Sequence, residues 1–134
     1  MPVWSRDFPR TFEAATEARS FLRGVLSSRI PAQVLDDVTL MTSELATNGV
    51  RHVSAAEGDW LEVLVEYGVD VLKISVRDPG TDFGREEDEV IPRGGQTGGW
   101  GLPIVNGLSS RWGVAPDAGG TTVWFEVDQP MGGE

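Results

Sequence analysis

The chain has 134 residues with 40% hydrophobic residues, a length and an apolar content that suit one folded domain and exclude a disordered chain. Its formal charge is −10, from 21 acidic and 11 basic residues, which is the reverse of the basic footprint of a nucleic-acid binder. No cysteine is present, so we expect no disulfide. No apolar run approaches the roughly 18 residues of a membrane span, and the N-terminus lacks the pattern of a signal peptide. We therefore expect a cytoplasmic protein whose partners include neither nucleic acid nor a membrane.

The first half of the chain predicts an extended segment and two helices. Aromatic residues and prolines over residues 4–12 indicate an edge strand. Apolar residues recur at helical spacing over residues 13–28. Pro31 suits the first turn of a second helix, which carries an apolar stripe and continues to about His52.

The second half predicts strands, a long loop and one short helix. The loop is polar, acidic and glycine-rich, which is typical of a functional lid or a disordered segment. The predicted strands are residues 60–67, 69–76, 111–115 and 121–127, the loop is 78–99, and the helix is 101–108. Such elements predict a single α/β domain over residues 1–134, a two-layer sandwich with a mixed, mostly antiparallel sheet that is covered by helices on one face.

Two polar residues of the second predicted helix border its apolar stripe. Glu44 lies one turn before Asn48, so their side chains are neighbours. One interpretation is a helix end that rises into solvent, with Asn48 bonded to a nearby loop. The other is a site in which the amide oxygen binds Mg²⁺ and the carboxylate accepts a proton from a nucleophile.

Three further segments carry turn or ligand chemistry. Asp78 lies at the end of a β-rich run. It is either the first residue of an ordinary Asp-Pro-Gly turn or a carboxylate that accepts a hydrogen bond from an exocyclic amine. Gly99 and Gly101 open a helix, where glycines direct N–H groups at an anion or simply form a flexible loop. The hydroxyls of Thr121 and Thr122, after a glycine turn, are expected to face the same cleft. The dinucleotide-binding and Walker glycine patterns are absent from the sequence.

Together these segments resemble the histidine-kinase-like ATPases. Ser43-Glu44-Leu45-Ala46-Thr47-Asn48 is similar to their N box, and the three glycine boxes are matched at Asp78-Pro79-Gly80, Gly99-Trp100-Gly101-Leu102 and Gly120-Thr121-Thr122. The short length and the form of the N box resemble the anti-sigma-factor serine/threonine kinases and their single-domain relatives of actinomycetes. The resemblance extends over nearly the whole chain, from about Glu13 to Val127.

The resemblance implies a Bergerat-type ATP site and a role for each matched residue. Glu44 would be the catalytic base and Asn48 the ligand of Mg²⁺. Asp78 would bind the adenine amine, in a pocket shaped by Gly80 and by the threonines of the last strand. The phosphates would lie at Gly99, Gly101 and Leu102, beneath a lid of about residues 81–98.

The resemblance also implies protein partners. Arg19 matches a position near the protein interface of the kinases, and a homodimer is compatible with the family. His52, the only histidine, is read as a helix-end residue rather than a catalyst. The partner would be a sigma factor, an anti-sigma antagonist protein, or both.

Two functions follow, and two departures separate them. A serine kinase that acts on an anti-sigma antagonist is favoured by the retained Glu44. A non-catalytic, ATP-dependent interaction module is favoured by Thr97, where the kinases often have a basic residue, and Asp82 replaces a further glycine of the first box. A histidine kinase fragment is disfavoured, because no phospho-acceptor helix pair precedes the domain.

Overall fold

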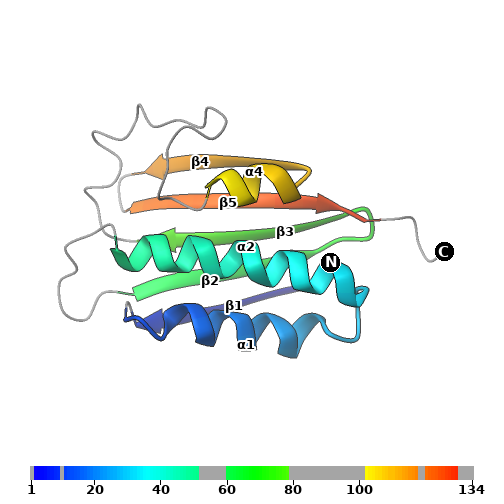
Figure 1. Cartoon of the computed structure of the whole chain (residues 1–134), viewed down its shortest axis with the longest axis horizontal. Coiled ribbons are helices and arrows are strands. Elements are labelled where there is room, and N and C mark those ends of the chain that lie inside the picture. The colour runs from blue at the N-terminus through cyan, green and yellow to red at the C-terminus, as the bar shows by residue number, and fades with distance from the viewer. Residues whose placement is uncertain (1, 10, 52–59, 79–101, 118–119, 130–134) are drawn as a thin grey trace.

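A computed structural model describes residues 2–9, 11–51, 60–78, 102–117 and 120–129 of the chain (Figure 1). Five strands and three helices lie in these ranges. In chain order they are β1 (Val3–Pro9), α1 (Ala14–Leu26), α2 (Ala32–Arg51), β2 (Trp60–Tyr67), β3 (Val71–Asp78), α4 (Leu102–Leu108), β4 (Arg111–Asp117) and β5 (Gly120–Asp128).

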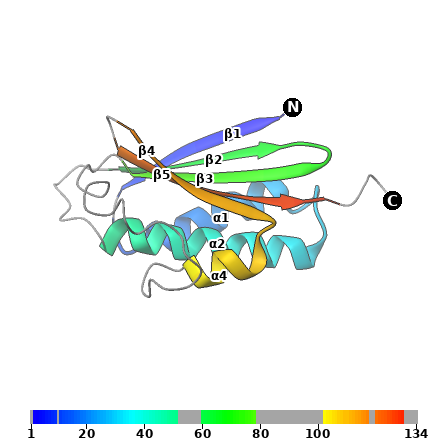
Figure 2. The same ribbon diagram turned by 90° about the horizontal axis from the view of Figure 1, so that it is seen from above.

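The strands form one sheet in the order β1-β2-β3-β5-β4. Each neighbouring pair is antiparallel, so the sheet predicted to be mostly antiparallel is antiparallel throughout the described strands. The three helices cover one face of the sheet and leave the other face uncovered (Figure 2). The predicted two-layer α/β sandwich is therefore confirmed, with β1 and β4 at the two edges.

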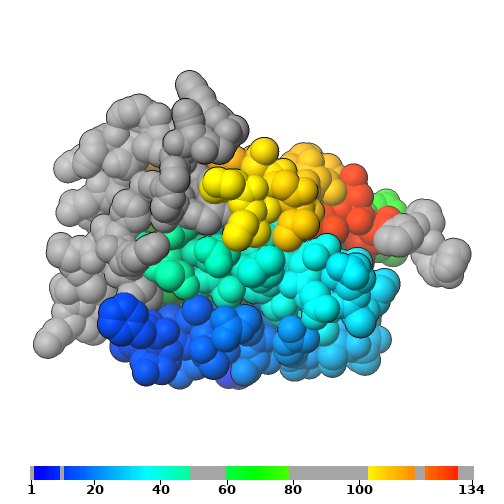
Figure 3. Space-filling view, viewed as in Figure 1, coloured from blue at the N-terminus to red at the C-terminus, as the bar shows by residue number. Residues whose placement is uncertain are grey.

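The core lies between the sheet and the helices. Alternate residues of β3, Leu72, Ile74 and Val76, are buried on the helix side. They meet the predicted apolar stripe of α2, where Val38, Met41 and Leu45 are buried. α1, α2 and α4 lie side by side over this core (Figure 3).

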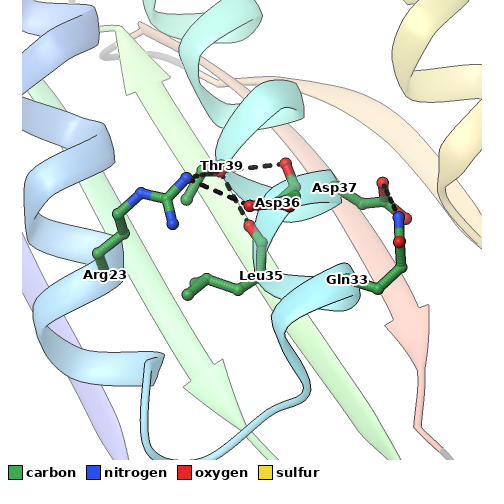
Figure 4. A network of polar contacts seen from close by, with 6 residues as sticks. All are labelled: Arg23, Gln33, Leu35, Asp36, Asp37 and Thr39. Carbon is green, nitrogen blue, oxygen red and sulfur yellow. Dashed lines mark hydrogen bonds and ion pairs between the residues drawn. The ribbon is translucent and has the colours of Figure 1, made fainter.

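A polar contact joins the first two helices and shows which side of α2 faces α1 (Figure 4). The Arg23 guanidinium of α1 lies 3.4 Å from a carboxylate oxygen of Asp36 and 3.4 Å from the hydroxyl of Thr39. The Thr39 hydroxyl in turn donates to the carbonyl of Leu35 at 2.9 Å. The side of α2 that carries Thr39 therefore faces α1.

Arg29 joins the turn after α1 to the sheet. Its guanidinium lies 5.0 Å from the ring centre of Trp4 on β1 and 5.8 Å from that of Tyr67 on β2. The Tyr67 hydroxyl donates to the Arg29 carbonyl at 3.2 Å. One side chain thus holds the turn against two strands, because a guanidinium over an aromatic face is attracted electrostatically.

The turn between β2 and β3 holds both ends of the described chain. The Tyr67 N–H donates to the carbonyl of Pro2 at 3.0 Å, and the Gln129 N–H donates to the carbonyl of Asp70 at 2.8 Å. The Gln129 side-chain amide also donates to the carbonyl of Gly68 at 2.7 Å. The start of β1 and the end of β5 therefore lie at the same end of the sheet (Figure 1).

Candidate functional site

Four elements meet at the other end of the molecule. The C-terminal end of α2, the last residue of β3, the first residues of β5 and the start of α4 lie there together (Figures 1 and 2). The predicted site residues that belong to these elements are Glu44, Asn48, Asp78, Leu102, Thr121 and Thr122. The fold therefore brings together segments that are far apart in the sequence.

Asp78 and Thr121 are direct neighbours at this end of the sheet. The register of β3 and β5 pairs Asp78 with Thr121 and Ile74 with Phe125. Since residues of a strand alternate between faces, Asp78 and Thr121 share the helix side with these two core residues. Asp78 is 7% exposed and Thr121 is 3% exposed. Each is therefore a buried polar residue at the end of a row of apolar residues on its strand.

The two threonines of β5 lie on opposite faces of the sheet. Thr122 pairs with Arg77, and both are only partly buried on the uncovered face. Only Thr121 therefore shares a face with Asp78, and the placement gives no support to an adenine-pocket role for Thr122. The alternation of Thr121 with Val123, Phe125 and Val127 is the sequence signal that distinguishes the two.

Asn48 and Glu44 lie on the side of α2 that faces away from α1. Asn48 is about two and a half helical turns beyond Thr39, so it lies on the opposite side of the helix. Glu44, about one turn before Asn48, is partly exposed, whereas Asn48 is 7% exposed. The predicted pair thus has one member in the core and one at its margin.

The Asn48 amide has a hydrogen-bonding group that the described residues do not satisfy. Its Nδ2 is buried and has no hydrogen-bond partner among them. A buried polar atom without a partner costs about 1–3 kcal/mol, which makes this group a candidate contact for a ligand. Because rotation of the amide exchanges its oxygen and nitrogen, the same side chain can offer an oxygen to a cation or an N–H to a phosphate.

The donor set suits adenine and a Mg²⁺ held together with phosphates. A buried carboxylate beside a hydroxyl can accept a hydrogen bond from an exocyclic amine, and an amide oxygen is a ligand that Mg²⁺ accepts. Among the described residues no group of three or more histidine, aspartate or glutamate side chains could hold a metal alone.

Several predicted residues lie outside the described residues or beside the site. Leu102 is the first residue of α4, and Arg19 on α1 donates to the Thr16 hydroxyl at 3.3 Å. Nothing in the described helices is long and apolar enough to cross a membrane. The predicted positions outside the described residues are Gly80, Gly99, Gly101, His52, Asp82, Thr97 and the lid over residues 81–98.

The described residues form a two-layer α/β domain with buried polar residues where one end of the antiparallel sheet meets the C-terminal end of α2. Residues 8–127 match the family model of the histidine kinase-like ATPase domain, and the chain belongs to this family. Membership indicates ATP binding, in agreement with the buried polar groups at the site. No curated protein matches the chain.

Proposed function

We propose that the protein is a Mg·ATP-binding regulator that acts as an anti-sigma-factor serine kinase. Its substrate would be a serine of an anti-sigma antagonist protein, and a sigma factor would be its second partner. The observation that carries the proposal is the buried amide nitrogen of Asn48, which has no hydrogen-bond partner among the described residues and lies one turn from the partly exposed carboxylate of Glu44.

Each residue has a defined task in this proposal. Asp78, with Thr121 beside it, accepts the adenine amine. Asn48 offers its amide oxygen to Mg²⁺, which supplies charge neutralisation for the phosphates. Glu44 takes the proton of the partner's serine hydroxyl while that oxygen bonds to the γ-phosphorus and the bond to the ADP leaving group breaks.

Calorimetry with Mg·ATP tests the nucleotide site. Asp78→Asn removes a charged acceptor, so we expect affinity to fall about 10-fold or more. Thr121→Val should weaken binding, whereas Thr122→Val, on the other face of the sheet, should leave it unchanged. Equal effects of the two threonine variants would contradict the assignment, and so would full affinity in Asp78→Asn.

Transfer of label from γ-labelled ATP tests the kinase step. The protein is used to capture partners in the presence of ATP, and phosphorylated serines are then mapped on the captured proteins. Glu44→Gln should bind ATP as the wild type does and transfer no label. If the wild type binds ATP and transfers no label to any captured partner, the protein is an ATP-dependent interaction module and the kinase proposal is wrong.

A further inference from the structure

The face of the sheet that the helices leave uncovered is acidic on its β1–β2 half (Figure 2). Side chains of a strand alternate between the two faces, so every second residue of β1 and β2 points outward. These outward residues include acids and no base. They are Val3, Ser5, Asp7, Pro9, Trp60, Glu62, Leu64 and Glu66. On the other half of the face acids and bases are mixed, because Arg111 makes ion pairs with both Glu126 and Asp128.

Strand β2 presents a stripe of alternating chemistry on this face. Trp60, Glu62, Leu64 and Glu66 occupy every second position, at intervals of about 6.6 Å. The Trp60 side chain is 48% exposed, and Leu64 is partly exposed. The solvated face of an antiparallel sheet is normally polar. Large apolar side chains between carboxylates are instead suited to a surface that a partner covers.

A hollow lies at the Trp60 end of this stripe. It has a volume of about 220 Å³ and is lined by Asp7, Trp60, Glu62 and Arg77. Asp7 is directly opposite Glu62 in the register of β1 and β2, and like charges in this position destabilise a sheet. Among the described residues neither carboxylate makes an ion pair. Arg77, opposite Glu62 on β3, offsets only one of the two negative charges.

An exposed indole beside surplus negative charge suits the end of an arginine side chain. A guanidinium stacks on the face of a tryptophan ring, and its planar fork of N–H donors matches carboxylate oxygens better than a lysine ammonium does. Leu64 lies two residues beyond Glu62, about 6.6 Å along the strand. Residues four apart on one side of an α-helix are separated by about 6 Å. A helix laid along β2 can therefore place an arginine in the hollow and an apolar side chain on Leu64.

We propose that the uncovered face at β1 and β2 binds a helix of another protein, one that carries an arginine and, four residues away, a large apolar residue. The helix would add a third layer to the sandwich. The formal charge of −10 favours such a basic segment through electrostatic complementarity. This surface is separate from the proposed ATP site, because Asp78 and Thr121 lie on the helix side of the sheet.

Nuclear magnetic resonance titration of the full chain without nucleotide tests the surface. The probe is a lactam-bridged helical peptide in which an arginine and a leucine, four residues apart, are the only large side chains on one side. It should shift the indole signal of Trp60 and the methyl signals of Leu64, and leave those of Leu40, exposed on α2, unchanged. A matched peptide with glutamate in place of the arginine should shift none of them. Binding should weaken as NaCl is added, because the ion pairs are screened.

Variants of the protein separate the surface from the effect of net charge. Glu62→Lys should weaken binding of the arginine peptide about 10-fold or more. Glu17→Lys, exposed on α1, changes the net charge equally and should bind the peptide as the wild type does. Trp60→Ala should weaken binding about 5-fold, through loss of the stacked ring. If melting shows that Glu62→Lys does not fold, Glu62→Gln keeps the size of the side chain and should still bind about 3-fold more weakly.

Several outcomes would overturn the proposal. An arginine peptide that leaves the Trp60 signal unmoved at millimolar concentration would do so, and so would equal affinity in the wild type and the Glu62 variants. A Trp60 signal that moves when the protein alone is diluted would assign the face to a second copy of the chain. If a soluble paramagnetic agent did not broaden the Trp60 signal of the free protein, another part of the same chain would cover the face.

Discussion

The buried threonines of α2 differ in whether their hydroxyls are satisfied. The Thr39 hydroxyl bonds to the Leu35 carbonyl, and the Thr42 hydroxyl is buried without a partner among the described residues. Thr42→Val should therefore leave the free energy of unfolding unchanged or raise it by about 1 kcal/mol, because an unsatisfied group is removed. Thr39→Val, the matched change, should lower it by about 1 kcal/mol. Urea unfolding measures both, and the opposite order would contradict the assignment.

A glycine of β4 is needed for close packing on the uncovered face of the sheet. A Cβ at Gly113 would lie 2.8 Å from the Trp124 ring, which is also covered by the Lys73 ammonium at 5.0 Å. Gly113→Ala should lower the free energy of unfolding by about 1–3 kcal/mol through overpacking.

The control for this variant is a helical glycine with space around it. Gly24→Ala on α1 meets nothing within 4 Å and should raise the free energy of unfolding by about 0.5–1 kcal/mol. Chemical denaturation of the two variants separates steric from conformational effects. If Gly113→Ala raised the free energy of unfolding as Gly24→Ala is expected to, the Trp124 ring would not restrict this position and the overpacking interpretation would be wrong.

At the scale of the elements, two arginines of the α1 region make contacts that contribute unequally to the free energy of unfolding. Arg29 stacks on Trp4 and Tyr67 and joins α1 to two strands. Arg23 makes an ion pair with Asp36 in which the side chains are 50% and 66% exposed. Arg29→Ala should lower the free energy of unfolding by about 1–2 kcal/mol, and Arg23→Ala by less than about 1 kcal/mol.

The salt dependence of these variants provides a second measurement. A surface ion pair is screened by salt, whereas stacking on rings depends on it less. The loss caused by Arg23→Ala should therefore shrink in 0.5 M NaCl, while the loss caused by Arg29→Ala should persist. A loss at Arg29 that disappears in salt would contradict the stacking interpretation.

Element positions could be predicted from the sequence, and their contacts could not. The apolar period of α2 placed Met41 and Leu45 in the core, and the structure confirms it. The second strand of the first hairpin was predicted two residues early, because Gly68 to Asp70 form the turn. The strand thus extends to Asp78, which is the last residue of β3 rather than the first of a loop.

Which residues belong to the candidate site could be predicted from the sequence, but how they are arranged could not. Asn48 and Asp78 could be named from local patterns and the family resemblance. The pairing of Asp78 with Thr121 depends on the β3–β5 register, which joins segments separated by a long stretch of chain. That the Asn48 amide nitrogen is buried without a partner among the described residues depends on which groups of other elements lie around the end of α2. Neither is encoded in local spacing.

At the scale of the whole molecule, the charge of −10 opposes the compact state. We expect the melting temperature to rise by a few degrees between about 0.05 and 0.5 M NaCl, as repulsion between carboxylates is screened. The pKa of Arg111 is raised above its ordinary value, chiefly by its hydrogen bond to Asp128, so this group stays charged throughout the neutral range. A melting temperature that falls with added salt would show that attractive ion pairs dominate.

The turn that holds Pro2 and Gln129 also determines how the fold resists mechanical force. A pull applied through the two ends of the described chain loads the bonds from Tyr67 to Pro2 and from Gln129 to Asp70 first. Because the start of β1 and the end of β5 lie at the same end of the sheet, the pull loads each ladder from that end, and its bonds open one pair at a time rather than being sheared together. Single-molecule stretching should therefore find rupture at low force, with the end of the sheet that carries Asp78 and Thr121 the last to separate.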